Sequence, residues 1–354
     1  MANPFVYGEV VPVSAFVDRE TELDRLTSDL LAGQKIFLIS PRRYGKSSLV
    51  AQALKAAARG GALTVDVTVS SYSSYVAFLE GYARALVSIE TKLDRAKAWL
   101  REMLGAVRAE VRVEPGVSGQ GQLAISFPSV RSDRDISRLA EEVFALPARV
   151  AEARKRRMAI ALDEFQAIGA FNGGSVEHAL RAAVQHQRQV GYVFSGSEPT
   201  LMERMLGRNR PFYKAGPVMR LQKIPADRFA AFLEARFRAT GLKPAQGLGV
   251  AIVELAGNLP YDVQRLAHEV WDDARAGGTK TVTLDDLHTT LRRLLGEHET
   301  LFEGVWQRLT LSQRGALRAA VLEDGRELLS ADVRGRYRLS GASTVQASLA
   351  ALVR

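Results

Sequence analysis

Short apolar runs alternate with longer segments of helical periodicity along the N-terminal part of the chain. The apolar runs predict strands at about 35–40, 62–68, 158–163, 190–195 and 217–222. Apolar residues spaced three and four apart predict helices near 46–58, 74–90, 132–156 and 174–188, and residues 16–26 predict a turn into an acidic amphipathic helix before the first strand. Strands that alternate with helices predict an α/β fold with a parallel sheet covered on both faces.

The pattern becomes purely helical from about residue 223. Four helical segments are predicted near 225–239, 247–256, 260–275 and 283–298, with no strand among them. Three shorter ones follow, at 312–323, 330–338 and 341–354, and the polar run from Ser340 suits the N-cap of the third. Their order resembles a helix-turn-helix. We therefore expect a core at 1–222, a helical lid at 223–299 and a helix-turn-helix or winged-helix-like domain at 300–354.

Residues 92–130 interrupt the core pattern between the second and third strands. A helical segment leads into AEVRVEPGVSGQGQLAISF, which alternates apolar and polar residues on both sides of a glycine-rich turn. This arrangement predicts a β-hairpin. The hairpin either projects from the core or extends the edge of the sheet.

The segment KIFLISPRRYGKSSL, residues 35–49, contains the most specific motif of the chain. A strand, a short loop, Gly45-Lys46-Ser47 and a helix form the phosphate-binding arrangement of P-loop NTPases. Backbone N–H groups at the helix N-terminus bind phosphate, Lys46 supplies a cation, and the hydroxyl of Ser47 is a ligand for Mg²⁺. The motif departs from its usual form at Ser40, where glycine is usual.

A second motif, RRMAIALDEFQAI, lies at residues 156–168. Asp163 and Glu164 follow the strand at its C-terminal end. A carboxylate there can hold Mg²⁺, and an adjacent glutamate can polarise the attacking water, so Asp163 is the candidate metal ligand and Glu164 the candidate general base. The alternative for the motif alone is a buried strand that runs into an acidic helix cap.

Composition narrows the function classes. The chain has 354 residues, enough for two or three domains, and its zero cysteines exclude disulfides, thiol catalysis and cysteine-based zinc sites. Its five histidines are scattered, and we take them as structural or surface residues. It has no long apolar run and no signal-like N-terminus, so we expect a cytoplasmic protein without membrane insertion. The net charge of +9 fits an acidic partner such as nucleic acid, or simply an arginine-rich composition.

Five motifs together resemble the archaeal and bacterial ATPase group of the AAA+/STAND P-loop NTPases, relatives of the origin-recognition ATPases. They are FVDRETE, PRRYGKSSL, LDEFQ, YVFSGSE and GNLPYDVQRLA. The resemblance covers nearly the whole chain and implies a RecA/AAA+-like fold, with ATP and Mg²⁺ bound between core and lid. Asp18 stands where the first motif usually has glycine.

The resemblance also implies roles for single residues. Ser197, with Ser195 as second choice, would sense the γ-phosphate, and Lys46 and Glu164 would act in catalysis. Pro260 would pack near the adenine, although a proline at the first position of a helix explains it equally well. The implied nucleotide-binding set is Arg19, Pro41, Arg42, Arg43, Tyr44, Gly45, Lys46, Ser47, Ser48 and Pro260.

Two further arginines are candidates for phosphate contact. Arg210, in GRNRPFYK, would stabilise charge on the γ-phosphate, in cis or across a subunit boundary. The alternative is a surface arginine before a proline turn. Arg265, one turn after Pro260, is a second candidate.

We interpret the chain as a slow, partner-regulated ATPase that couples nucleotide state to the positions of its lid and C-terminal domain. One alternative is a DNA-binding ATPase, a replication-loading or transposition helper that holds duplex DNA through its C-terminal domain. Another is a nucleotide-binding scaffold with negligible turnover. A protein partner and a homo-oligomer both stay open, and the resemblance alone favours ATP over GTP.

Overall fold

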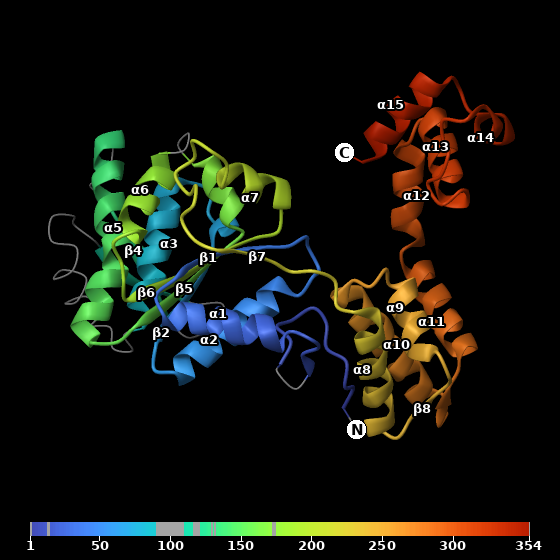
Figure 1. Cartoon of the computed structure of the whole chain (residues 1–354), viewed down its shortest axis with the longest axis horizontal. Helices are drawn as coiled ribbons and strands as arrows, with labels where there is room; N and C mark the ends of the chain where they lie inside the picture. Colours follow the sequence, from blue (N-terminus) through green and yellow to red (C-terminus); the bar gives the residue numbers. More distant parts are fainter. Residues whose placement is uncertain are drawn as a thin grey trace. The chain divides into compact units, whose positions relative to one another are not determined.

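The computed structural model describes residues 2–12, 15–89, 110–115, 121–128, 130, 132–171 and 175–353 (Figure 1). Contacts between residues divide the chain into two compact units, Met1–Leu284 and Asp285–Arg354. This single division falls after Leu284, so the expected three-part division at 222/223 and 299/300 stays a prediction.

A parallel five-stranded sheet forms the centre of the first unit. Its order is β2-β5-β6-β1-β7, and every neighbouring pair is parallel. The strands are β1 Lys35–Ile39, β2 Leu63–Thr68, β5 Met158–Asp163, β6 Val190–Gly196 and β7 Val218–Arg220. All five predicted strands and the predicted α/β fold class are therefore confirmed.

Alternate side chains of the strands enter two separate cores, as the two-residue period of a strand requires. Phe37 and Ile160 belong to the core on one face, whereas Leu38 and Ala161 belong to the core on the other. Helices cover both faces (Figure 1). The second core contains residues of α1 Glu20–Leu31 and α2 Lys46–Arg59, and the first contains residues of α3 Tyr75–Val87, α5 Asp133–Arg154 and α6 Ser175–Val184.

The predicted hairpin is confirmed, with β3 Glu110–Pro115 and β4 Gly121–Ser126 paired antiparallel in a sheet of their own. The helix expected before it lies outside the described residues. Within residues 1–222, three described short elements have no sequence prediction: the 3₁₀ helices Val69–Ser71 and Phe165–Ala170, and α7 Pro199–Met205.

Three helices complete the first unit: α8 Ala226–Ala239, α9 Leu248–Leu255 and α10 Pro260–Ala276. The expectation that strands stop at residue 223 is wrong, because β8 Lys243–Pro244 pairs in parallel with β9 Thr281–Val282. Each of these strands has two residues. Such a length is too short to produce an alternating pattern, so the sequence could not reveal them.

The described elements of the second unit are all helices. It contains α11 Leu284–Glu297, which begins at the division, then α12 Glu299–Arg308, α13 Leu311–Leu322, α14 Ala331–Arg336 and α15 Ala342–Leu352. The three predicted C-terminal helices are present, but α12 was not predicted. The expected Ser340 cap is wrong, since Gly341 is the N-cap of α15 and makes no side-chain cap. The winged-helix assignment stays a prediction.

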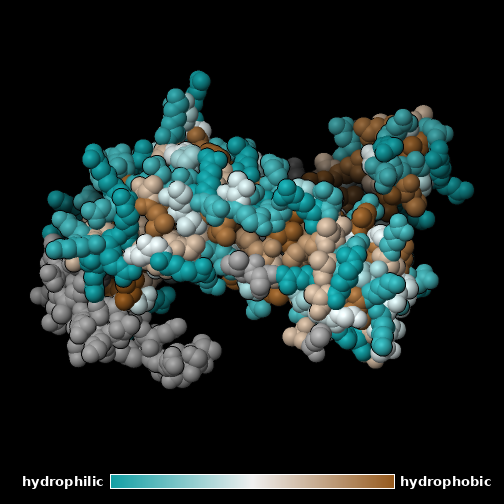
Figure 2. Space-filling model, turned by 60° about the horizontal axis from the view of Figure 1, so that its bottom comes forward, coloured by the Kyte–Doolittle hydropathy of each residue, from teal (hydrophilic) through white to brown (hydrophobic). Residues whose placement is uncertain are grey.

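The second unit has a small core and much apolar surface, visible as brown atoms in Figure 2. Its last three helices bury mainly small side chains, among them Ala316, Ala319, Val333 and Val345. Among the described residues, no helix is both long and apolar enough to cross a membrane.

Candidate functional site

The phosphate-loop motif forms a tight turn between β1 and α2. Gly45 is the N-cap of α2 and has φ of 85°, a left-handed conformation that glycine adopts without strain. Arg43, two residues earlier, also has positive φ, at 70°. This turn directs the chain into α2 so that the first N–H groups of the helix lie at the loop, where they can bind an anion.

The strand register brings two motifs to the same edge of the sheet as this loop. One is the acidic motif at Asp163 and Glu164, and the other is the serine motif at 195–197. Leu38 of β1 pairs with Ser195 of β6, and Thr68 of β2 pairs with Asp163 of β5. Because the strands are parallel, their C-terminal ends meet at one edge, where ligands bind in sheets of this kind. The phosphate loop, the acidic motif and the serine motif therefore converge at this edge.

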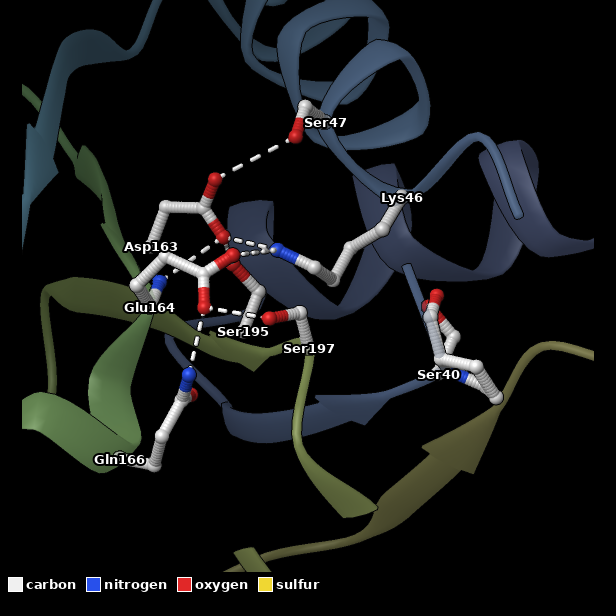
Figure 3. A network of polar contacts seen from close by, with 9 residues as sticks. Ser40, Lys46, Ser47, Asp163, Glu164, Gln166, Ser195 and Ser197 are labelled. Carbon is white, nitrogen blue, oxygen red and sulfur yellow. Dashed lines mark hydrogen bonds and ion pairs between the residues drawn. The ribbon is translucent and has the colours of Figure 1, made fainter. Parts of the chain in front are cut away.

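Lys46 and Asp163 form the centre of a polar network (Figure 3). The Nζ of Lys46 donates to Oδ1 of Asp163, and Ser195 Oγ donates to the same oxygen at 2.6 Å. Ser47 Oγ lies 3.3 Å from Oδ2. Burial raises the pKa of the Asp163 carboxyl, but the charge of Lys46 and the hydrogen bonds from Lys46 and Ser195 outweigh it, so the pKa lies below its usual value. Asp163 is therefore an anion at neutral pH.

Glu164 follows with φ of 50°, so its side chain leaves the strand in a new direction. Its Oε1 lies 3.5 Å from Lys46 Nζ. Its Oε2 accepts hydrogen bonds from Ser197 Oγ at 2.6 Å and from Gln166 Nε2 at 2.5 Å. Burial raises the pKa of the Glu164 carboxyl, but the two hydrogen bonds and the charge of Lys46 together lower it by more. The pKa of this carboxyl therefore also lies below its usual value. Ser197 contacts the candidate base directly.

A cavity of about 330 Å³ opens beside this network. Its wall includes every residue of the predicted nucleotide-binding set: Arg19, Pro41, Arg42, Arg43, Tyr44, Gly45, Lys46, Ser47, Ser48 and Pro260. Glu164 and Ser197 also line it. The other lining residues are largely apolar or aromatic and include Val6, Tyr7, Val11, Phe16, Val17, Ile224, Phe229 and Tyr261. A cationic region beside an apolar one suits a nucleotide, whose phosphates are charged and whose base is flat and largely apolar.

The N-terminal segment is a wall of the cavity that sequence reasoning missed. Val11 is fixed to α2, because its N–H donates to Ser48 Oγ at 3.1 Å and its carbonyl accepts from Gln52 Nε2 at 2.7 Å. Tyr7 packs edge-on against Tyr261 of α10, with ring centroids 5.8 Å apart. One segment thus contacts the phosphate-loop helix and α10. Its motif-free sequence gave no signal of this role.

The loop and α10 are also joined by an ion pair. Arg43 Nη1 lies 3.1 Å from Asp262 Oδ2, and the guanidinium lies 5.5 Å from the centroid of the Tyr261 ring. Pro260 is the first residue of α10 and it also lines the cavity. A proline that starts a helix and a proline beside the nucleotide site are therefore compatible descriptions of it. Because 57% of the Arg43 side chain is exposed, this pair is worth at most about 1 kcal/mol and can open readily.

Arg210 lies elsewhere. Its Nη2 is 2.5 Å from Oε1 of the fully buried Glu177, and it lines a second cavity of about 470 Å³ rather than the first. Burial raises the pKa of Glu177, and Arg210 opposes that shift. Glu164 and Arg42 line both cavities, so Arg210 is near the site without facing its phosphate loop. Arg265 is not among the residues that line the first cavity. Phosphate contact by either arginine stays a prediction.

The residues present fit Mg²⁺ bound together with a phosphate. Within the described ranges, no three His, Asp or Glu residues are grouped to hold a metal by themselves. Asp163 and Ser47 offer a carboxylate and a hydroxyl 3.3 Å apart beside the loop. Mg²⁺ commonly takes one or two protein oxygens and completes its shell with water and substrate phosphates.

Comparison with known proteins identifies the fold. The Walker-type ATPase of Pyrococcus abyssi is 15% identical with a TM-score of 0.52, covering 96% of this chain and 92% of that one. The ORC1 protein of Aeropyrum pernix, solved in complex with DNA, is 14% identical with a TM-score of 0.54, covering 97% and 85%. Cdc6p of Pyrobaculum aerophilum is 16% identical with a TM-score of 0.50, covering 99% and 88%.

The comparison with curated proteins gave no match. A family model described as an ATPase domain predominantly from Archaea matches residues 16–266, which is more than half of the chain. This range contains the phosphate loop, Asp163, Glu164, Ser197 and Pro260. The chain therefore belongs to this family of P-loop ATPases, and its core has the AAA+ fold of the origin-recognition proteins.

Proposed function

We propose that this protein is an ATP-driven conformational switch, in which ATP and Mg²⁺ bind in the cavity between the phosphate loop and α10. The observation that carries the proposal is the shared wall: Lys46 and Glu164 from the sheet edge line one cavity with Pro260 and Tyr261 from α10. A ligand that fills the cavity must contact both parts. A ligand with differential contacts can shift the balance between two arrangements.

Each side chain of the site has a role that follows from its position. Lys46 would bind the β and γ phosphates, exchanging part of its contact with Asp163 for contact with the nucleotide. Asp163 and Ser47 would hold Mg²⁺, which when bound neutralises charge that develops on the phosphates. Glu164 Oε1 would orient the attacking water, while Oε2 stays anchored by Ser197 and Gln166. The apolar wall would hold the base.

The Arg43–Asp262 pair and the Tyr7–Tyr261 contact are the elements that nucleotide would bias. Both join α10 to other parts of the chain that line the cavity. Opening or closing them would change the position of α10, and α10 leads through β9 into α11. We propose that slow hydrolysis, regulated by a partner, times this change.

The switch predicts nucleotide-dependent protection in the C-terminal segment. Residues 301–354 should exchange their amide hydrogens at different rates in the nucleotide-free, ADP-bound and ATP-analogue-bound protein, because movement of α10 reaches them through α11. Hydrogen exchange read by mass spectrometry would measure this, with the peptides of α5, which does not line the cavity, as an internal reference. Identical protection of 301–354 in all three states would reject the switch and leave the ATPase assignment intact.

A DNA-binding ATPase is the second candidate, because one of the structural neighbours was solved in complex with DNA. Residues 301–354 contain eight arginines against five acidic residues, and α13–α15 are three short helices in sequence. We expect such binding to weaken steeply with salt, since contacts to phosphates release counterions. A chain lacking 301–354 that still binds duplex DNA would exclude these helices as the binding element.

A scaffold that binds ATP without meaningful turnover is distinguished by steady-state hydrolysis, measured alone and with added DNA. A protein partner or a homo-oligomer would appear as a change in molecular size on nucleotide addition. Both measurements use the full chain.

A further inference from the structure

Gln166 makes the closest side-chain contact to Glu164. It lies in the short 3₁₀ helix Phe165–Ala170, and its Nε2 donates to Glu164 Oε2 at 2.5 Å. Ser197 Oγ donates to the same oxygen at 2.6 Å (Figure 3). One carboxylate oxygen is therefore held by two neutral donors, and the other, Oε1, faces Lys46 Nζ at 3.5 Å.

The orientation of the Gln166 amide follows from its neighbour. If the Gln166 amide were turned the other way, its oxygen would lie against Oε2 of Glu164. Both atoms are acceptors, so no hydrogen bond could form between them. The observed orientation leaves Gln166 Oε1 buried with no hydrogen-bond partner. An unpaired buried acceptor costs about 1–3 kcal/mol, so an apolar side chain of similar size would serve stability better here.

The neighbouring strand leaves space for this amide. A Cβ added to Gly196 would come within 2.7 Å of Gln166 Oε1, and within 2.4 Å of the Met202 side chain. Glycine at this position lets the end of β6 pack directly on the Gln166 side chain. The amide thus lies between β6 and Glu164, and Gln166 also lines the second cavity.

Gln166 differs from the other two side chains that contact Glu164. Lys46 also binds Asp163, and Ser197 also lines the cavity, so changing either would disturb nucleotide binding as well as Glu164. Gln166 does not line the first cavity. A substitution of Gln166 can therefore alter the direction of Glu164 without removing a group that faces the nucleotide.

We propose that Gln166 is a positioning residue for ATP hydrolysis: it anchors Oε2 of Glu164 so that Oε1 points to the phosphate end of the cavity. This inference rests on the proposed role of Glu164 in hydrolysis. Gln166 acts on the rate of the chemical step and leaves nucleotide affinity unchanged. A misplacement of a catalytic group by about 1 Å can lower the rate by up to about a hundredfold.

Two substitutions test the anchor. Gln166→Leu keeps the approximate volume and removes the donor, and Gln166→Glu keeps the shape and places a second carboxylate against Glu164. We expect kcat to fall about tenfold in the first and further in the second, while KM and the Kd for ATP with Mg²⁺ change less than about twofold. Gln185→Leu, the same change at an exposed position, is the matched control and should leave kcat unchanged. Thermal melting establishes that each variant is folded.

A double-mutant cycle separates positioning from a structural role. In a Glu164→Gln background, Gln166→Leu should cause no further loss of the residual single-turnover rate, because the group that it positions is already inactive. An equal loss in both backgrounds, or an unchanged kcat in both Gln166 variants, would overturn the role of Gln166 alone. A wild-type protein without turnover, or one whose turnover survives Glu164→Gln, would overturn the proposed function and this inference with it.

Discussion

Replacing Lys46 by alanine should weaken ATP binding by at least about a hundredfold, because no other cation lies where its ammonium group does. Lys46 is the first residue of α2, 6% of its side chain is exposed, and it contacts both Asp163 and Glu164. Arg19, Arg42 and Arg43 also line the cavity, but Arg19 is paired with Glu22, Arg43 is paired with Asp262, and Arg42 lies in the loop ahead of α2. Titration of the folded variant with a fluorescent ATP analogue would measure the loss.

The control for Lys46→Ala is Lys55→Ala, which removes the same charge from an exposed position of the same helix. It should keep wild-type affinity. Lys46→Ala also leaves Asp163 and Glu164 without their shared cation, so its melting temperature must be compared with that of the wild type. A folded Lys46→Ala protein that binds ATP as tightly as the wild type would contradict the assignment of the phosphate loop.

The central strands of the sheet could be predicted because they are buried on both faces. The runs at 158–163 and 190–195 match β5 and nearly match β6, Val190–Gly196, and every residue of β6 is buried. Continuous apolar runs of this length, separated by helical periodicity, are typical of parallel sheets. The strand order could not be read from the same pattern, since it depends on which faces pack together.

The phosphate end of the site was predictable for a related reason. Lys46 and Ser197 follow a buried strand, Asp163 is the last residue of one, and parallel strands end at one edge. The sequence can therefore place such a motif at this edge of the sheet, even when it does not show which side chains the motif contacts. The hydrogen-bond partners of the side chains at this edge were less predictable. Ser197 was expected to sense phosphate, and in the structure its hydroxyl contacts Glu164. Gln166 was not singled out at all.

At the apolar end of the cavity, Pro260 of the GNLPYDVQRLA motif was the one residue expected from the resemblance, and the other lining residues had no comparable signal. Tyr7 and Val11 reach it from the N-terminal segment, and Tyr261 reaches it from α10. These residues are far apart in sequence, and they meet only through the packing of tertiary structure. Arg210 was singled out because it follows the serine motif in the sequence. In the structure it pairs with the buried carboxylate of Glu177 and lines the second cavity, so its contact with phosphate stays a prediction.

Glu164→Gln should keep ATP and Mg²⁺ bound while hydrolysis falls by about a hundredfold or more. The substitution retains the size of the side chain, and its amide oxygen can still accept from Ser197 and Gln166 in the place of Oε2. The amide nitrogen then takes the place of Oε1, where it can neither accept a proton from water nor pair with Lys46, 3.5 Å away. Binding should survive because Lys46 keeps its contact with Asp163, and Asp163 keeps the candidate metal site with Ser47.

The control for Glu164→Gln is Glu198→Gln, the same change one residue beyond Ser197, at an exposed side chain that does not line the first cavity. Parallel measurements of ATP affinity and phosphate release in both variants separate binding from chemistry. Loss of both in Glu164→Gln would mean that Glu164 supports the phosphate loop through Lys46 and has no separate part in the chemical step. Wild-type hydrolysis in Glu164→Gln would remove it from the mechanism, and Asp163 would then be the remaining carboxylate at the end of β5 that could act as the base.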